Sequence, residues 1–143
     1  MADAPWHSLS EVKALAAADK FDLGVTSATK RILPHLLDRT LDGERRFAKA
    51  VVAQLRLLDF AHRVNLPRKL GKGFVVHDVY ATRLGDAIAK AHLEGTHKTT
   101  WYVKLTIISA GGRRVFVLSL HCLMDPIRRA DGTTLSPTWK ESQ

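Results

Sequence analysis

The stretch WYVKLTIISAGGRRVFVLSLHCL, residues 101–123, decides the fold of this chain. Apolar side chains alternate with their neighbours in both arms, which is typical of half-buried strands. Gly111 and Gly112 lie between the arms and can supply the positive φ angles of a two-residue hairpin turn. The stretch therefore predicts a β-hairpin, and we expect the rest of the chain to be organised around it.

This turn also predicts which residues face one another. One face carries only apolar pairs, which are Trp101 with Cys122, Val103 with Leu120, Leu105 with Leu118 and Ile107 with Phe116. The other face sets Tyr102 opposite His121 and Lys104 opposite Ser119, with Cβ atoms about 4.5–5.5 Å apart in each pair. This polar patch is either a functional site or the ordinary surface of a solvated sheet. A three-residue loop would instead bury His121 and expose Leu120.

Composition and charge narrow the class of protein. The 143 residues are 45% hydrophobic and 25% charged, as expected for one globular domain, residues 1–143. The net charge of +8 favours a polyanionic partner, which could be nucleic acid, an anionic membrane or an acidic protein. The single cysteine, Cys122, excludes a disulfide within the monomer and is expected in the core. Because no apolar run reaches membrane length and no signal-peptide pattern opens the chain, we expect a cytoplasmic protein without a membrane partner.

Four segments have helical patterns. Ser8 and Glu11 are spaced as a capping box for a helix from Leu9 to about Lys20. Thr26 or Ser27 can cap a second helix that runs to Leu37. A third pattern starts at Glu44 and continues to about Asn65, where Pro67 ends it. A short helix is predicted within residues 85–95.

The second half of the chain predicts a small sheet. Residues 74–80, FVVHDVY, form a strand that joins the hairpin in a meander of three antiparallel strands. We therefore expect an α+β fold in which N-terminal helices pack on a small antiparallel sheet of about three strands. The tail, residues 124–143, is expected to be irregular, with one docked piece around Trp139. The loop at residues 67–73 carries Arg68, Lys69 and Lys72, and either grips phosphates or is a solvated connector.

Five blocks resemble, in order, those of the MqsR-type toxins. They are LSEVKAL at residues 9–15, DFAHR at 59–63, HDVYATRL at 77–84, WYVKLTII at 101–108 and VFVLSLH at 115–121. The resemblance implies a RelE-like two-layer fold for residues 8–123 and the activity of a type II toxin that cuts mRNA without a metal ion or cofactor. It also implies a cognate antitoxin as a protein partner. The segment before Trp101, between the third and fourth blocks, is longer than in the family. The tail that follows the last block is an addition to the family's pattern.

The family's active-site positions fall on His62, His77, Tyr102 and His121. Only Tyr102 keeps the family's residue type, since the family has lysine, glutamine and lysine where this chain has its three histidines. Because these three residue types differ, the family's catalytic roles are not carried over directly. The differences also place histidine, the side chain best matched to proton transfer near neutral pH, at three site positions.

RNA supplies its own nucleophile, the 2′-hydroxyl, so cleavage needs a base, an acid and positive charge near the phosphorane. We expect His62 and His121 to be the acid–base pair, with His77 and Tyr102 as positioning groups. Arg83, Lys104 and the cations of residues 67–73 are expected to bind RNA and stabilise charge. Which histidine is the base is left open.

Three alternatives remain. His62, His77 and His121 could form a three-histidine metal site, although their spacing has no short-motif signature. A non-catalytic nucleic-acid-binding regulator on the same fold would use the positive charge equally well. A protein-interaction domain could present its basic surface to an acidic partner.

Overall fold

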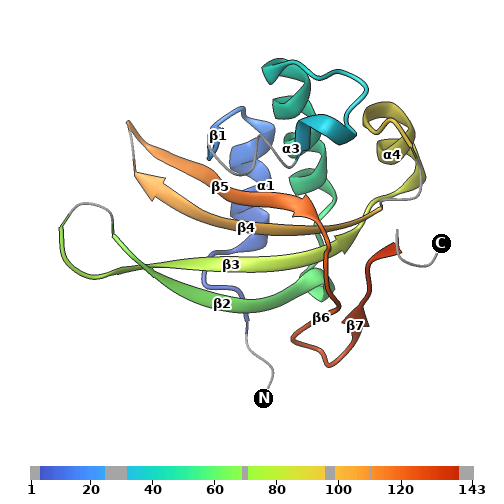
Figure 1. The fold of residues 1–143 in the computed structure, drawn as a ribbon. Helices are drawn as coiled ribbons and strands as arrows, with labels where there is room; N and C mark the ends of the chain where they lie inside the picture. Colours follow the sequence, from blue (N-terminus) through green and yellow to red (C-terminus); the bar gives the residue numbers. More distant parts are fainter. Residues whose placement is uncertain (1–3, 25–31, 69–70, 96–98, 110, 139–143) are drawn as a thin grey trace.

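The centre of the protein is a five-stranded mixed sheet (Figure 1). The computed structural model describes residues 4–24, 32–68, 71–95, 99–109 and 111–138. The strand order is β1-β5-β4-β3-β2, and only the β1–β5 pair is parallel. The strands are β1 Phe21–Leu23, β2 Phe60–Pro67, β3 Phe74–Arg83, β4 Thr100–Ser109 and β5 Arg113–Cys122.

Helices cover one face of this sheet. The α-helices of the described residues are α1 Leu9–Ala17, α3 Leu41–Gln54 and α4 Asp86–His92, and short 3-10 turns occupy Leu33–His35 and Leu57–Asp59. Their apolar side chains form one core with the inner sides of the strands, where Phe47 packs edge-on against Trp101 at a centroid distance of 4.9 Å. None of the described helices is long and apolar enough to cross a membrane.

The predicted sheet of about three antiparallel strands is wrong. Strands β3, β4 and β5 form the expected meander, but β2 extends it on one side and β1 adds a parallel pair on the other. Residues 60–65 were expected in a helix and instead belong to β2. The helix α3 ends at Gln54, because Leu55 has an extended ψ of 141° and the Asp59 side chain accepts a hydrogen bond from the Arg56 amide at 2.9 Å. The expected caps Thr26 and Ser27 lie outside the described residues.

The first helix begins as predicted. The Ser8 hydroxyl accepts a hydrogen bond from the Glu11 amide at 3.4 Å, and α1 then runs to Ala17, three residues short of the expected end.

The hairpin register is confirmed at one end and wrong at the other. Tyr102 pairs with His121, as predicted, and the neighbouring apolar pairs towards the open end of the hairpin also match. Towards the tip, however, each residue of β4 pairs with the residue one position earlier in β5 than predicted. Ser109 pairs with Arg113, so three residues instead of two lie between the paired ends. A bulge at Leu118 absorbs the extra residue. The three-residue loop therefore does not bury His121.

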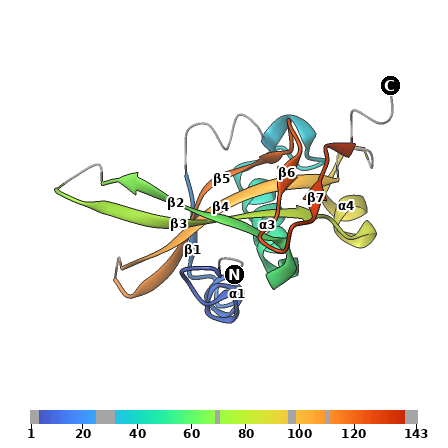
Figure 2. The same ribbon diagram turned by 90° about the horizontal axis from the view of Figure 1, so that it is seen from below.

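The tail is more ordered than expected. Strands β6 Ile127–Arg128 and β7 Thr134–Leu135 form a small hairpin that lies beside one end of the main sheet (Figure 2). Leu123 and Leu135 pack with Ala81 in a second apolar cluster. The region around Trp139 lies outside the described residues.

Ala81 neighbours Tyr80 on β3, and Tyr80 belongs to the core under the helices. Because successive side chains of a strand point to opposite faces, the tail hairpin and the helices lie on opposite faces of the sheet. We call the face opposite the helices the open face.

Candidate active site on the open face of the sheet

The open face brings polar residues of four strands onto one surface. One row across the sheet runs from His62 on β2 through Val79 to Lys104 on β4 and Ser119 on β5. Tyr102 and His121 lie two residues along from this row on the same face, since side chains alternate along each strand. His77 shares the face by the same rule. The four residues expected in the active site are therefore on one face of the sheet, although they do not form a single cluster.

The closest grouping is Tyr102, His121 and Lys104. The phenol and imidazole rings are stacked, with centroids 4.7 Å apart and planes within 13° of parallel. The Lys104 ammonium lies 5.8 Å from the centre of the Tyr102 ring, which is within the range of a cation–π contact. Burial raises the pKa of the Tyr102 phenol, so this side chain stays protonated and neutral near pH 7. An imidazole, a hydrogen-bond donor and a cation thus share one small area.

A hydrogen bond sets the tautomer of His121. Its Nδ1 atom lies 2.9 Å from the Cys122 carbonyl oxygen. Because a carbonyl only accepts, Nδ1 must carry the proton, and in the neutral imidazole the basic lone pair is then on Nε2. The backbone therefore prepares this histidine to act as a base through Nε2.

A hollow of about 230 Å³ adjoins the stacked rings. Tyr102 and His121 form one side of it, and the segment from Leu123 to Ile127 forms the other. This segment contributes Met124 and Asp125, for which the sequence predicts only an irregular tail. No motif in the sequence connects them with the site, and only the docked tail hairpin places them there.

His77 is in a different environment. It is buried, and its Nδ1 donates to the Val75 carbonyl at 3.2 Å. Burial lowers its pKa; the hydrogen bond to Val75 opposes the shift, and the positive charge of Lys104 adds to it. His77 is therefore neutral near pH 7 and contributes no positive charge to the open face.

His62 is exposed on β2, and the structure does not bring it to His121. Two strands separate β2 from β5, and neighbouring strands lie about 4.7–4.9 Å apart. The Cα atoms of His62 and His121 are thus on the order of 14 Å apart, before any offset along the strands. Strand side chains stand roughly perpendicular to the sheet, so the imidazoles cannot close this gap. They cannot act as an acid–base pair on one phosphate in this conformation.

Cations lie around the open face. Arg83 is exposed at the end of β3, where it pairs with Thr100. Arg68 and Lys72 are exposed in the loop that joins β2 to β3, while Lys69 lies outside the described residues. The loop is closed by a bond from the Arg68 amide to the Gly73 carbonyl at 3.1 Å, and Gly73 has a φ of 97°. These cations suit an extended polyanion rather than a compact anion.

Within the described ranges, no three side chains of His, Cys, Asp or Glu come close enough together to hold a metal ion. The three histidines considered for a metal site are on strands β2, β3 and β5, with His62 and His121 far apart, so this arrangement is not assembled.

Comparison with protein-family models, with curated proteins and with solved structures found no match to this chain. The resemblance to MqsR-type toxins therefore stays a prediction from the sequence blocks.

Proposed function

We propose that the protein is a metal-independent endoribonuclease that cuts single-stranded mRNA. The proposal is supported by one observation above all, the stack of Tyr102 and His121 beside Lys104 on the open face. The net charge of +8 suits an RNA substrate, and the resemblance to MqsR-type toxins suggests the same activity. With that resemblance comes a cognate antitoxin as the expected protein partner.

In the proposed reaction, His121 Nε2 takes the proton of a ribose 2′-hydroxyl, and the 2′-oxygen attacks the adjacent phosphorus. The bond from phosphorus to the 5′-oxygen breaks and leaves a 2′,3′-cyclic phosphate. The Lys104 ammonium stabilises the phosphorane charge and gives a proton to the departing 5′-oxygen. Tyr102 is a positioning residue, since its ring fixes the plane of the imidazole.

This assignment changes three of the expected roles, since Lys104, expected to bind RNA and stabilise charge, is now also the proton donor. His62 is an RNA-binding residue rather than a proton-transfer residue, because of its separation from His121. His77 is a buried neighbour of Lys104 rather than a group that contacts the scissile phosphate.

The proposal predicts that purified protein cuts a single-stranded RNA oligonucleotide in excess chelator. His121→Ala should lower the cleavage rate by about a hundredfold or more, since a positioned base contributes about 10²–10⁴-fold. Binding of the RNA, measured by fluorescence anisotropy, should change by less than about twofold. His62→Ala is the matched control: the same substitution on the same face should cost less than about tenfold in rate.

Two results would contradict this mechanism. A substrate with 2′-deoxyribose at the cleavage site should not be cut, so an undiminished rate would rule out the 2′-hydroxyl route. Cleavage that stops in chelator and returns with zinc or manganese would replace the histidine mechanism by a metal mechanism.

A non-catalytic nucleic-acid-binding regulator is the second candidate, and the separation of His62 from His121 favours it. Expression without a partner distinguishes the two. An endoribonuclease toxin should arrest growth and deplete mRNA, and His121→Ala should relieve both effects. Normal growth with confirmed, folded protein would support the regulator.

A further inference from the structure

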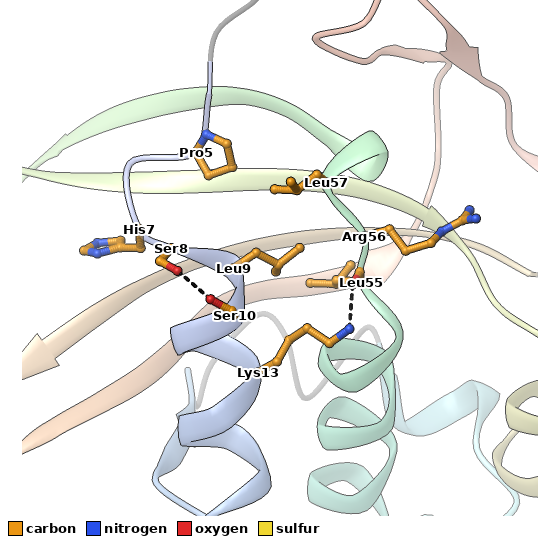
Figure 3. A pocket seen from close by; sticks show the side chains of 9 residues that line it. All are labelled: Pro5, His7, Ser8, Leu9, Ser10, Lys13, Leu55, Arg56 and Leu57. Atoms are coloured by element: carbon orange, nitrogen blue, oxygen red, sulfur yellow. Dashed lines mark hydrogen bonds between the residues drawn. The ribbon is translucent and has the colours of Figure 1, made fainter.

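A second hollow, of about 440 Å³, lies on the helix side of the sheet (Figure 3). It opens between the first turn of α1 and the segment that leads from α3 into β2. Pro5, Leu9, Leu55 and Leu57 give it apolar walls, and Lys13 and Arg56 lie at its edge. Its volume is in the range of about 300–1,000 Å³ that is common for binding pockets.

Two large apolar side chains of the segments that form this hollow are exposed, although only Leu57 lines it. Leu57 is 66% exposed, and Trp6, which follows Pro5 in the chain, is 59% exposed. A leucine or tryptophan on a mobile segment could fold back onto the protein. These two cannot easily do so, because their backbone is held in place by buried carboxylates.

The Asp59 side chain is fully buried and accepts a hydrogen bond from the Arg56 amide at 2.9 Å, which fixes the turn that carries Leu57. The Asp78 side chain is also fully buried, and its two oxygens accept from the amides of Trp6 and His7 at 2.7 and 2.9 Å. The apolar surface is therefore preorganised, and a partner that covers it does not have to order it first.

The rim of the hollow is positive. Among the described residues that line it there is no aspartate or glutamate, whereas Lys13 and Arg56 carry positive charge. Lys13 is held at the edge by donating to the Leu55 carbonyl at 3.0 Å, as Figure 3 shows. Arg56 has Asp59 within 3.8 Å, but that carboxylate also pairs with a second guanidinium, so the positive charge is not cancelled.

We propose that this groove docks an acidic, amphipathic peptide segment of another protein. An apolar side chain of the segment fills the hollow between Leu9 and Leu57, and its carboxylates pair with Lys13 and Arg56. The aliphatic walls do not suit nucleobases, which prefer aromatic partners. A second copy of this chain is disfavoured, because each copy carries a net charge of +8 and two positive rims would meet.

This inference goes beyond the proposed function and does not depend on it. The groove is on the helix side, and the sheet separates it from the open face. Peptide and RNA should therefore bind at the same time.

The test is selection from a phage-displayed random peptide library on the immobilised full chain. Recovered peptides should combine Leu, Ile or Phe with Asp and Glu. Synthetic copies should bind at least about tenfold more weakly to Leu57→Glu and to Lys13→Glu, as expected when an anchor contact or an ion pair at an interface is lost. The control is Leu41→Glu, at a leucine that is 72% exposed at the far end of α3, which should leave binding within about twofold.

Four outcomes would overturn the inference: no peptide is recovered, the recovered peptides are not enriched in acidic residues, Leu57→Glu binds as well as the unchanged protein, or saturating single-stranded RNA displaces the peptide. A dimer in sedimentation that Leu57→Glu converts to a monomer would also overturn it, in favour of a second copy. Failure of RNA cleavage would leave the peptide results unaffected, so the two proposals can fail separately.

Discussion

The ion pair between Arg129 and Asp59 holds the tail to the main sheet. The Asp59 side chain is fully buried and the Arg129 side chain is only 11% exposed, with Nη2 and Oδ1 3.2 Å apart. Arg129 also donates to the Ala81 carbonyl, from Nε at 3.1 Å and from Nη2 at 2.9 Å. One side chain thus satisfies a buried carboxylate and a buried backbone oxygen at once.

We predict that Arg129→Met lowers the free energy of unfolding by about 3–5 kcal/mol, because it leaves a buried charge without its main partner. The total stability of a domain is about 5–15 kcal/mol, so this is a large fraction. At about 2–4 °C per kcal/mol for a chain of this size, the melting temperature should fall by roughly 6–20 °C.

Urea unfolding followed by circular dichroism measures the loss. The matched control is Arg128→Met, at an exposed neighbour on β6, which should stay within about 0.5 kcal/mol of the unchanged protein. Hydrogen exchange should also speed up at the Ala130 amide, which bonds to the Phe60 carbonyl at 2.9 Å where the tail meets β2.

A loss below about 1 kcal/mol for Arg129→Met would refute this reasoning. It would mean that the other partners of Asp59, which are Thr82 and Arg56, compensate its charge without the tail. Equal losses for the two arginine variants would show that the position in the tail hairpin, and not the ion pair, determines the effect.

Two further predictions concern a titrating histidine and a packed glycine. Because burial lowers the pKa of His77 below its ordinary value of 6.5, the unfolded chain binds more protons, so stability should be full above about pH 7 and fall as the pH drops through 6.5. His77→Gln should flatten this dependence in urea unfolding at several pH values. Gly43→Ala should lower the melting temperature although alanine favours helix by about 1 kcal/mol over glycine, because the new Cβ would lie 2.2 Å from the Asp38 carbonyl oxygen. An unchanged or higher melting temperature would show that residue 38 moves aside at little cost.

The sequence predicts the central hairpin well because its signals are local. Alternating side chains and two glycines with positive φ, 68° and 110°, are enough to define β4 and β5, whereas the predicted pairing of Tyr102 with His121 holds because the bulge at Leu118 offsets the additional loop residue. The same reasoning correctly predicts the cap of α1 at Ser8.

The remaining strands depend on distant contacts. The spacing of Val51, Val52, Leu55 and Leu58 continues a helical stripe beyond Gln54, although Leu58 is exposed in the structure. What stops the helix is the buried Asp59, whose partner Arg129 is 70 residues away in sequence. Strand β1 has only three residues and pairs in parallel with β5, so its own sequence carries almost no signal.

The candidate site shows the same limit. The contact between Tyr102 and His121 follows from one hairpin and could be predicted. The distance from His62 to His121 depends on where β2 enters the sheet, and the predicted helix at residues 60–65 placed His62 on the wrong kind of element. The side of the hollow formed by Met124 and Asp125 requires the tail to dock.

The bulge at Leu118 also affects how the hairpin tolerates changes of length. It separates the tip of the hairpin, where Ser109 pairs with Arg113, from the end that carries Tyr102 and His121. Residues inserted at Gly111–Gly112 extend an exposed loop, while the pairing beyond the bulge is held by β3 on one side and by the apolar core beneath. The tip is thus a suitable place to insert a fluorescent label or an affinity tag, since the added residues would not shift the stacked rings.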